Sequence, residues 1–120
     1  MPFTIKYDKE IDCIFIKVDG QFDLSLLKML ASEVAKVIEK HGCRCIFNDL
    51  RNATLGDILD IYHMPNTARE TGIENMCKRA LIVNEIPSEF DFLETVFVNR
   101  GHQVRMFTDA DIANQWLLND

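Results

Sequence analysis

The sequence contains no concentration of positive charge. Over 120 residues it carries 13 Lys and Arg against 19 Asp and Glu, a formal net charge of -6 at pH 7. The basic residues are spread from Lys6 to Arg105, and the longest basic run is Lys78-Arg79. Such a field repels a nucleic-acid backbone or an anionic membrane surface on average. We therefore expect no nucleic-acid partner.

Long apolar runs are also missing. No stretch approaches the roughly 20 apolar residues that a membrane span requires, and residues 1–8 lack the pattern of a secretion signal. The sequence predicts no membrane span and a cytoplasmic protein. Four cysteines are then expected to be reduced thiols on buried strands, namely Cys13, Cys43, Cys45 and Cys77.

Linkers, repeats and low-complexity tracts are absent, and the chain has only 3 Pro and 5 Gly. A chain of this length with 48% hydrophobic residues can fill one core. We expect a single domain over residues 1–120.

Motifs that carry known chemistry are missing as well. The sequence has no G-x-G-x-x-G, no P-loop and no G-x-S-x-G, so we expect no enzyme, no catalytic residue and no cofactor. Asp57, Asp60 and His63 follow helical spacing and form an alternative acid/base group, but the same spacing is typical of a solvated helix face. His41, Cys43 and Cys45 lack a second pair of ligands, so no metal site is predicted.

What the sequence does contain is an alternation of strand and helix patterns. Period-two alternation over 3–7 and an apolar run over 11–18, ended by Asp19-Gly20, predict a hairpin. Asp23 is the predicted N-cap of a helix that closes at Gly42. Residues 43–47 then predict a central strand.

The second half repeats this alternation. A polar loop over 50–53 leads to a helix capped by Thr54 with Asp57, which Pro65 must end or kink, with a short helical turn closing at Gly72. The later predicted elements are a strand over 80–83, a helix from Pro87-Ser88 to Gly101, a strand over 104–107, and a helix over 112–117 capped by Thr108 with Asp111.

The resulting order is ββαβαβαβα. It predicts an α/β fold with a single mixed five-stranded sheet, in which an opening antiparallel hairpin is followed by parallel strands joined by right-handed crossovers. Four helices would cover this sheet.

Three segments carry a resemblance to a known family: residues 45–50, residues 99–101 ahead of the strand at 104–107, and residues 113–117. They resemble the STAS superfamily, the fold of bacterial anti-sigma-factor antagonists, and more narrowly its STAS/SEC14-like group of small bacterial proteins. The resemblance implies a regulatory module that docks on a partner. In the antagonist branch, a serine two residues after an Asp like Asp49 is phosphorylated to break that docking. Arg51 stands at this position, so the phospho-switch is not expected here.

Polar residues follow the predicted central strand, at the edge where ligands of open α/β sheets usually bind. Arg51, Asn52 and the amide groups after Thr54 are candidates to hold a phosphate, a carboxylate or a partner, with Asp49 beside them. Alternatively, Asp49 and Asn52 organise a turn and Arg51 is solvated.

The third predicted helix has an unusually wide apolar arc of roughly 160°, against the ~100° stripe that a core requires. An exposed remainder would mark a dimer face, a partner groove or the wall of an apolar cavity, whereas a deeply packed helix would leave none. The residues of this arc are Phe90, Phe92, Leu93, Val96 and Phe97.

These observations favour a non-enzymatic STAS-like interaction module, with a protein partner or a second copy in a homodimer bound through the third helix and residues 49–54. Asp in place of Phe92 would then abolish association without unfolding the protein. The alternative is a carrier of a small apolar or acidic ligand, with Tyr62, Met64 and the phenylalanines lining its cavity and Arg51 meeting an acidic head group. An enzyme using Asp57, Asp60 and His63 ranks below both.

Overall fold

The computed structural model describes residues 2–43, 45–55, 58–70, 78–85 and 88–118. Its elements follow the predicted order ββαβαβαβα. The strands are β1 (Phe3–Asp8), β2 (Cys13–Phe22), β3 (Cys45–Leu55), β4 (Lys78–Ile82) and β5 (Gln103–Phe107). The helices are α1 (Leu24–His41), α2 (Ile58–Glu70), α3 (Ser88–Asn99) and α4 (Ala110–Leu118).

The strands form one mixed sheet in the order β1-β2-β3-β4-β5. β1 runs antiparallel to β2, and every later neighbour is parallel, which confirms the predicted hairpin followed by crossovers. The carboxyl ends of β2, β3 and β4 therefore meet at one edge of the sheet.

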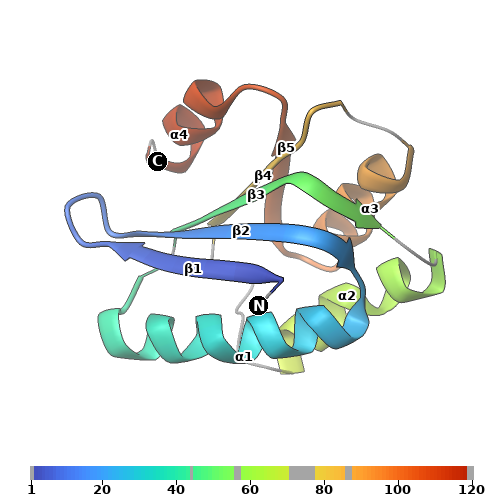
Figure 1. Ribbon diagram of the computed structural model, residues 1–120, viewed down its shortest axis with the longest axis horizontal. Helices are drawn as coiled ribbons and strands as arrows, with labels where there is room; N and C mark the ends of the chain where they lie inside the picture. The colour runs from blue at the N-terminus through green and yellow to red at the C-terminus, as the bar shows by residue number, and fades with distance from the viewer. Residues whose placement is uncertain (1, 44, 56–57, 71–77, 86–87, 119–120) are drawn as a thin grey trace.

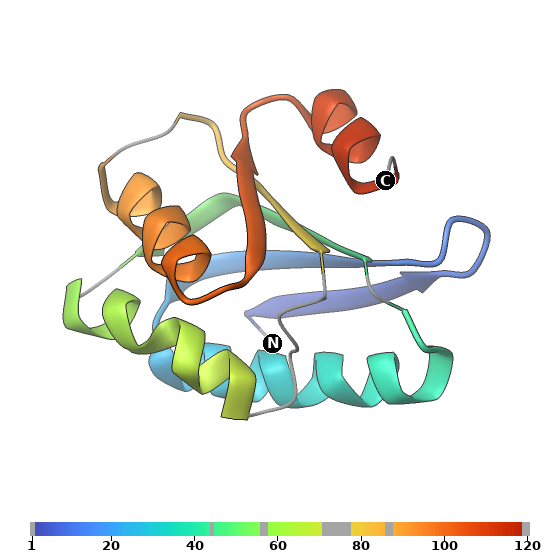
Figure 2. The same ribbon diagram turned by 180° about the vertical axis from the view of Figure 1, so that it is seen from behind.

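The helices cover the two faces of the sheet unequally. α1, α2 and α3 lie on one face and α4 lies alone on the other (Figures 1 and 2). The larger core fills the space under the three helices, and a smaller core lies between the sheet and α4. Because α4 packs over β3, β4 and β5, the outer face of β1 and β2 has no helix over it within the described part of the chain.

Helix α1 begins and ends where its sequence predicts. The Asp23 carboxylate accepts a hydrogen bond from the Leu26 amide at 2.9 Å, which satisfies a donor of the first turn. Gly42 has φ 69°, a left-handed conformation that costs glycine little, and its amide donates to the Ile38 carbonyl at 2.7 Å.

The predicted loop over 50–53 is wrong, because these residues continue β3 to Leu55. Likewise β2 does not end at Asp19-Gly20 but runs to Phe22. Thr54 lies opposite Gln21 within this ladder, so it does not cap the second helix as predicted. The polar composition misled the prediction, since backbone pairing between two exposed strand ends tolerates polar side chains.

A β-bulge lies inside this extended pairing. Lys17 is aligned with Asp49 and Asp19 with Asn52, so β3 advances by three residues where β2 advances by two. A bulge of this kind leaves one residue unpaired and redirects the neighbouring side chains. Arg51 and Asn52, although consecutive, are both exposed as a result.

Pro65 was predicted to end or kink the second helix, and the structure excludes the first of these, because α2 continues past it to Glu70. Proline lacks the amide that would donate to the Ile61 carbonyl, at a cost of about 3 kcal/mol in a helix interior. Pro65, Met64 and Ala68 are all buried, and the area they remove from water offsets part of this cost. Asp57 and the turn predicted at Gly72 lie outside the described residues.

Of two helix ends predicted in the last third of the chain, one is confirmed and the other is wrong. Gly101, at φ 86°, closes α3 as predicted: its amide donates to Val98 and the His102 amide donates to Phe97. The predicted Thr108 cap of α4 is wrong, because the Asp109 carboxylate accepts from the first amides of that helix, at 2.8 and 3.3 Å.

Candidate functional site

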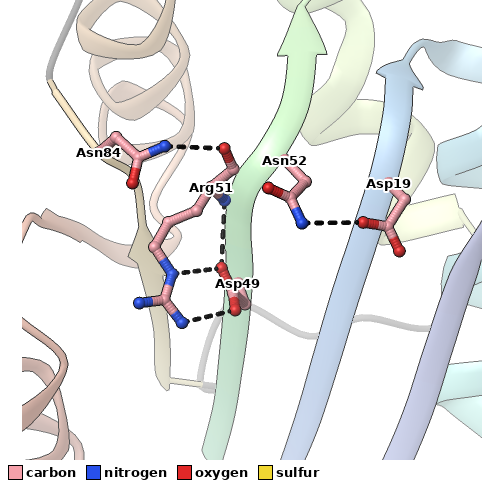
Figure 3. Close-up of polar contacts among 5 residues, drawn as sticks. All are labelled: Asp19, Asp49, Arg51, Asn52 and Asn84. Carbon is pink, nitrogen blue, oxygen red and sulfur yellow. Dashed lines mark hydrogen bonds and ion pairs between the residues drawn. The ribbon is translucent and has the colours of Figure 1, made fainter.

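A group of polar side chains, three of them predicted site residues, lies toward the carboxyl ends of three adjacent strands. Figure 3 shows Asp19 on β2, the segment Asp49 to Asn52 on β3, and Asn84 just after β4. The bulge in β3 lies at the centre of this group, which we name the bulge site. It is built by long-range strand pairing and not by a loop.

Asp49 and Arg51 form a two-pronged ion pair. Arg51 donates from Nε to Asp49 Oδ1 at 2.9 Å and from Nη2 to Oδ2 at 2.8 Å, and its amide also donates to Oδ1 at 3.1 Å. These hydrogen bonds hold the pKa of Asp49 below its ordinary value and raise that of Arg51. The Arg51 side chain is 48% exposed, so the pair presents a fixed cation at the surface.

Two further hydrogen bonds tie the site to its neighbouring strands. Asn52 donates from Nδ2 to Asp19 Oδ1 at 3.1 Å, across to β2 (Figure 3). Asn84 donates from Nδ2 to the Arg51 carbonyl at 2.9 Å, across from β4. Asp19 was not among the predicted site residues, although it stands at the predicted end of its strand, which is the signal that would have found it.

The structure gives the predicted anion cradle little support. Two nitrogens of Arg51 already bind Asp49, and Leu55, which follows Thr54, belongs to a strand and not to a helix N-terminus. Residues 56 and 57 lie outside the described residues. Asp49, Arg51 and Asn52 come together, whereas Thr54 stays apart as an exposed strand residue. The arrangement suits a shaped polar surface better than a pocket for a small anion.

Apolar side chains lie exposed on α2, which follows β3 in the chain. Leu59, near the start of this helix, is 66% exposed, and Tyr62, one turn later, is 47% exposed. The Arg100 guanidinium lies 5.2 Å from the centre of the Tyr62 ring and donates from Nη1 to Asn66 Oδ1 at 2.9 Å. Exposed aromatic and aliphatic groups beside fixed polar ones are typical of protein contact surfaces.

The apolar arc of α3 is mostly inside the molecule. Leu93, Val96 and Phe97 are buried, and Phe92 is partly buried against the same core. Among these four residues the expected surplus of exposed apolar surface is absent, because α3 packs against both the sheet and α2. The side chain of Phe90 lies outside the described part.

A cavity of about 60 Å³ lies in the larger core, between the sheet and the helices α1 to α3. Leu93 and Phe97 line it, but neither Tyr62 nor Met64 does, contrary to the expectation for a carrier. Arg51 is also not in its wall. The polar residues that do line it are Asn48 and Arg79.

The predicted acid/base group on α2 has no geometry that supports catalysis. His63 is exposed and meets the Tyr62 ring edge-on, with ring centroids 5.4 Å apart. Asp60 makes no hydrogen bond or ion pair with His63 in the described chain, and Asp57 lies outside it. An enzyme using this trio therefore gains no support from the structure.

The cysteines that the structure describes are thiols. Cys43 donates from Sγ to the carbonyls of Asp12 and Cys45, at 3.0 and 3.2 Å, and burial raises its pKa. Cys45 donates to the Leu117 carbonyl at 3.3 Å. Within residues 2–118, gaps excepted, no group of three or more His, Cys, Asp or Glu is placed to hold a metal ion. Cys77 lies in one of those gaps.

None of the helices in the described ranges is long and apolar enough to cross a membrane.

No protein-family model and no curated protein matches the sequence. Solved structures do match its fold. An anti-sigma factor antagonist from Mycobacterium paratuberculosis aligns with a TM-score of 0.63 and 11% identity, over 98% of this chain and 95% of that one. An uncharacterised DUF3478 protein with a SpoIIAA-like fold, from Shewanella loihica, aligns with a TM-score of 0.63 and 11% identity, over 96% and 93%.

The phosphorylated form of the Bacillus cell fate determinant SpoIIAA aligns with a TM-score of 0.59 and 10% identity, over 95% of this chain and 98% of that one. Each match covers nearly the whole chain in both directions. The chain therefore has the STAS-like α/β fold seen in anti-sigma factor antagonists.

Proposed function

We propose that this protein is a regulatory, non-enzymatic module that binds another protein through the bulge site and the exposed start of α2. The observation that carries the proposal is the adjacency of these two features in the chain: a polar strand end held by Arg51 and Asn52 leads into a helix that exposes Leu59. The similarity of the fold to anti-sigma factor antagonists supports a protein as the partner.

The proposed surface has the composition of a protein interface. Leu59 and Tyr62 supply apolar area that loses contact with water when a partner covers it. Arg51 and Asn52, on the strand that precedes this helix, supply polar groups, and both side chains are already fixed by hydrogen bonds, which lowers the entropy lost on binding.

The regulation of this contact is expected to differ from that of a phosphorylated antagonist. Arg51 stands where the resemblance implies a serine, and it has no hydroxyl to accept a phosphate. Its guanidinium is instead held against Asp49. We propose that the surface stays able to bind its partner unless another molecule covers it.

A photo-crosslinking amino acid placed at position 59 in the native host tests the proposal. The matched control is position 118, since Leu118 is 50% exposed and lies on α4, on the other face of the sheet. We expect one dominant crosslinked protein from position 59 that is missing from position 118. The mass of the product distinguishes a second copy of this chain from a different partner.

Leu59→Asp then tests the energetics. It should weaken binding of the crosslinked partner by at least about tenfold, because a charge would replace a buried apolar contact, while Leu118→Asp should leave binding unchanged. Both variants should unfold at similar denaturant concentrations, since both positions are exposed. Equal crosslinking from both positions, or undiminished binding by Leu59→Asp, would show that the partner does not bind at this surface.

A further inference from the structure

The cavity of about 60 Å³ in the larger core is too small for a lipid or a cofactor. Pockets for drug-sized ligands occupy about 300–1,000 Å³, whereas a water molecule takes about 30 Å³ of liquid volume. An occupant of this cavity therefore has only a few non-hydrogen atoms. Apart from Asn48 and Arg79, the residues that line the cavity are all apolar.

Asn48 is the first reason to expect an occupant. Its side chain is only 9% exposed, lines the cavity and makes no hydrogen bond within the described part of the chain. The rest of the wall is apolar apart from Arg79, so the Asn48 amide is the feature that sets the chemistry of this part of the cavity. The cavity is thus lined by an amide that can both donate and accept a hydrogen bond.

Arg79 is the second reason. It lies on the neighbouring strand β4, two residues before Leu81, with which Asn48 is aligned, and the side chains of Arg79 and Asn48 both line the cavity. Its guanidinium lies 5.3 Å from the Phe97 ring centre and contacts His102 Nδ1. Arg79 Nε is buried, and no atom of the described residues is placed to accept its hydrogen bond. Because a guanidinium nitrogen only donates, this atom favours an occupant with an acceptor oxygen.

Two side chains that can donate hydrogen bonds, both from strands of the sheet, and an otherwise apolar wall together fit a particular chemistry. We propose that this cavity binds a short-chain monocarboxylate of the size of acetate or propionate. The carboxylate accepts hydrogen bonds from Asn48 Nδ2 and from Arg79, and the alkyl end packs against the apolar wall, which includes Leu30 and Leu93. This inference is independent of the proposed protein contact, which uses a different surface.

The test is an NMR titration of ¹⁵N-labelled protein with sodium propionate at pH 7, with sodium chloride matching the ionic strength of each step. Saturable shifts are expected for amides of the cavity wall. Asn48→Leu should abolish them, because it removes the amide donor, and Ala31→Val should weaken them at least tenfold by filling the cavity. Asn99→Leu, the same change at an exposed position of α3, should leave them intact.

Thermal unfolding supplies the check on folding. Without propionate, the unfolding temperature of Asn48→Leu should equal or exceed that of the unmodified protein, since an apolar side chain matches the apolar wall of the cavity. Only the unmodified protein and Asn99→Leu should gain stability when propionate is added. If the cavity holds only water, propionate should give no saturable shift up to 50 mM, which is about a thousandfold above a typical protein concentration in such spectra. That result, undiminished binding by Asn48→Leu, or equal binding of neutral 1-propanol would overturn the proposal.

Discussion

Two side chains that normally seek water, Arg79 and His102, lie together in the larger core. Arg79 is 6% exposed and His102 is 3% exposed, and Arg79 Nη2 contacts His102 Nδ1. Because a guanidinium can only donate, Nδ1 must accept, so the histidine is neutral with its proton on Nε2. Burial, and then the positive charges of Arg79 and Arg69, lower the pKa of His102 to about 4, while the Pro65 carbonyl opposes them.

This arrangement predicts a loss of stability in mild acid. His102 takes up a proton near pH 6.5 in the unfolded chain but only near pH 4 in the folded protein. The folded state is therefore fully stabilised above pH 6.5 and loses up to about 3 kcal/mol as the pH falls from 6.5 to 4. Urea unfolding at several pH values measures this loss.

His102→Gln is the control for the acid prediction, because glutamine does not titrate and can still accept from Arg79. Its stability should fall less steeply between pH 6.5 and 4 than that of the unmodified protein. Parallel curves for the two proteins would show that other groups cause the acid sensitivity.

At the scale of elements, α3 shows how tertiary packing uses a wide apolar arc. Its residues meet the sheet on one side and α2 on the other, so two contacts in different directions bury more than one stripe. The polar side of the helix also contributes to the sheet: Glu94 accepts a hydrogen bond from the Met106 amide of β5 at 2.6 Å. The helix is thus held by both its apolar and its polar groups.

Neighbouring residues of α3 give a matched pair for testing this packing. Phe97 is 7% exposed and lines the cavity, so Phe97→Ala should lower the free energy of unfolding by about 3–5 kcal/mol. Val98, the next residue, is 50% exposed, and Val98→Ala should change it by less than about 0.5 kcal/mol. Guanidinium unfolding measures both, and similar losses would contradict the assigned orientation of α3.

Phe92→Asp has a different expected outcome from the one the sequence alone suggested. Phe92 packs against the larger core, so a charge there has to be buried or must open the contact between α3 and its neighbours. Loss of association in this variant would therefore not separate a contact surface from a folding defect. Leu59 replaces it as the position at which the proposed interface is tested.

At the scale of the whole molecule, two buried cysteines belong to the two different cores. Cys43 belongs to the larger core under α1, whereas Cys13 belongs to the smaller core near α4. Both are buried, at 0% and 1% exposed. Neither thiol can meet a reagent in water unless the side chains that pack around it move apart.

Alkylation of these thiols should therefore report on the opening of the two cores. In native conditions, Cys13 and Cys43 should react with iodoacetamide at least about a thousandfold more slowly than in the unfolded chain, because only the rare open state reacts. Mass spectrometry of the separate peptides gives the two rates. Rates that differ widely between Cys13 and Cys43 would show that the two layers open independently.

Much of the fold follows from local signals. Asp23, the amphipathic spacing after it and Gly42 determine α1 and both of its ends, because caps and helical periodicity act within a few residues of one another. The order of elements and the mixed sheet follow in the same way, since strand and helix patterns alternate along the chain. For the bulge site, the sequence placed Asp49, Arg51 and Asn52 next to one another at the carboxyl side of the central strand, and the structure has them there.

Only the tertiary structure decided the rest. Residues 50–55 form a strand because the exposed end of β2 lies beside them. Pro65 does not end its helix because the residues around it bury it. The pairing of Arg51 with Asp49 depends on a bulge that is defined by two strands. The free energies involved come from contacts between residues far apart in the sequence. Local propensities of a few tenths of a kcal/mol to about 3 kcal/mol per residue are overridden where such contacts gather, which is why the sequence determined the architecture and the packing determined its surfaces.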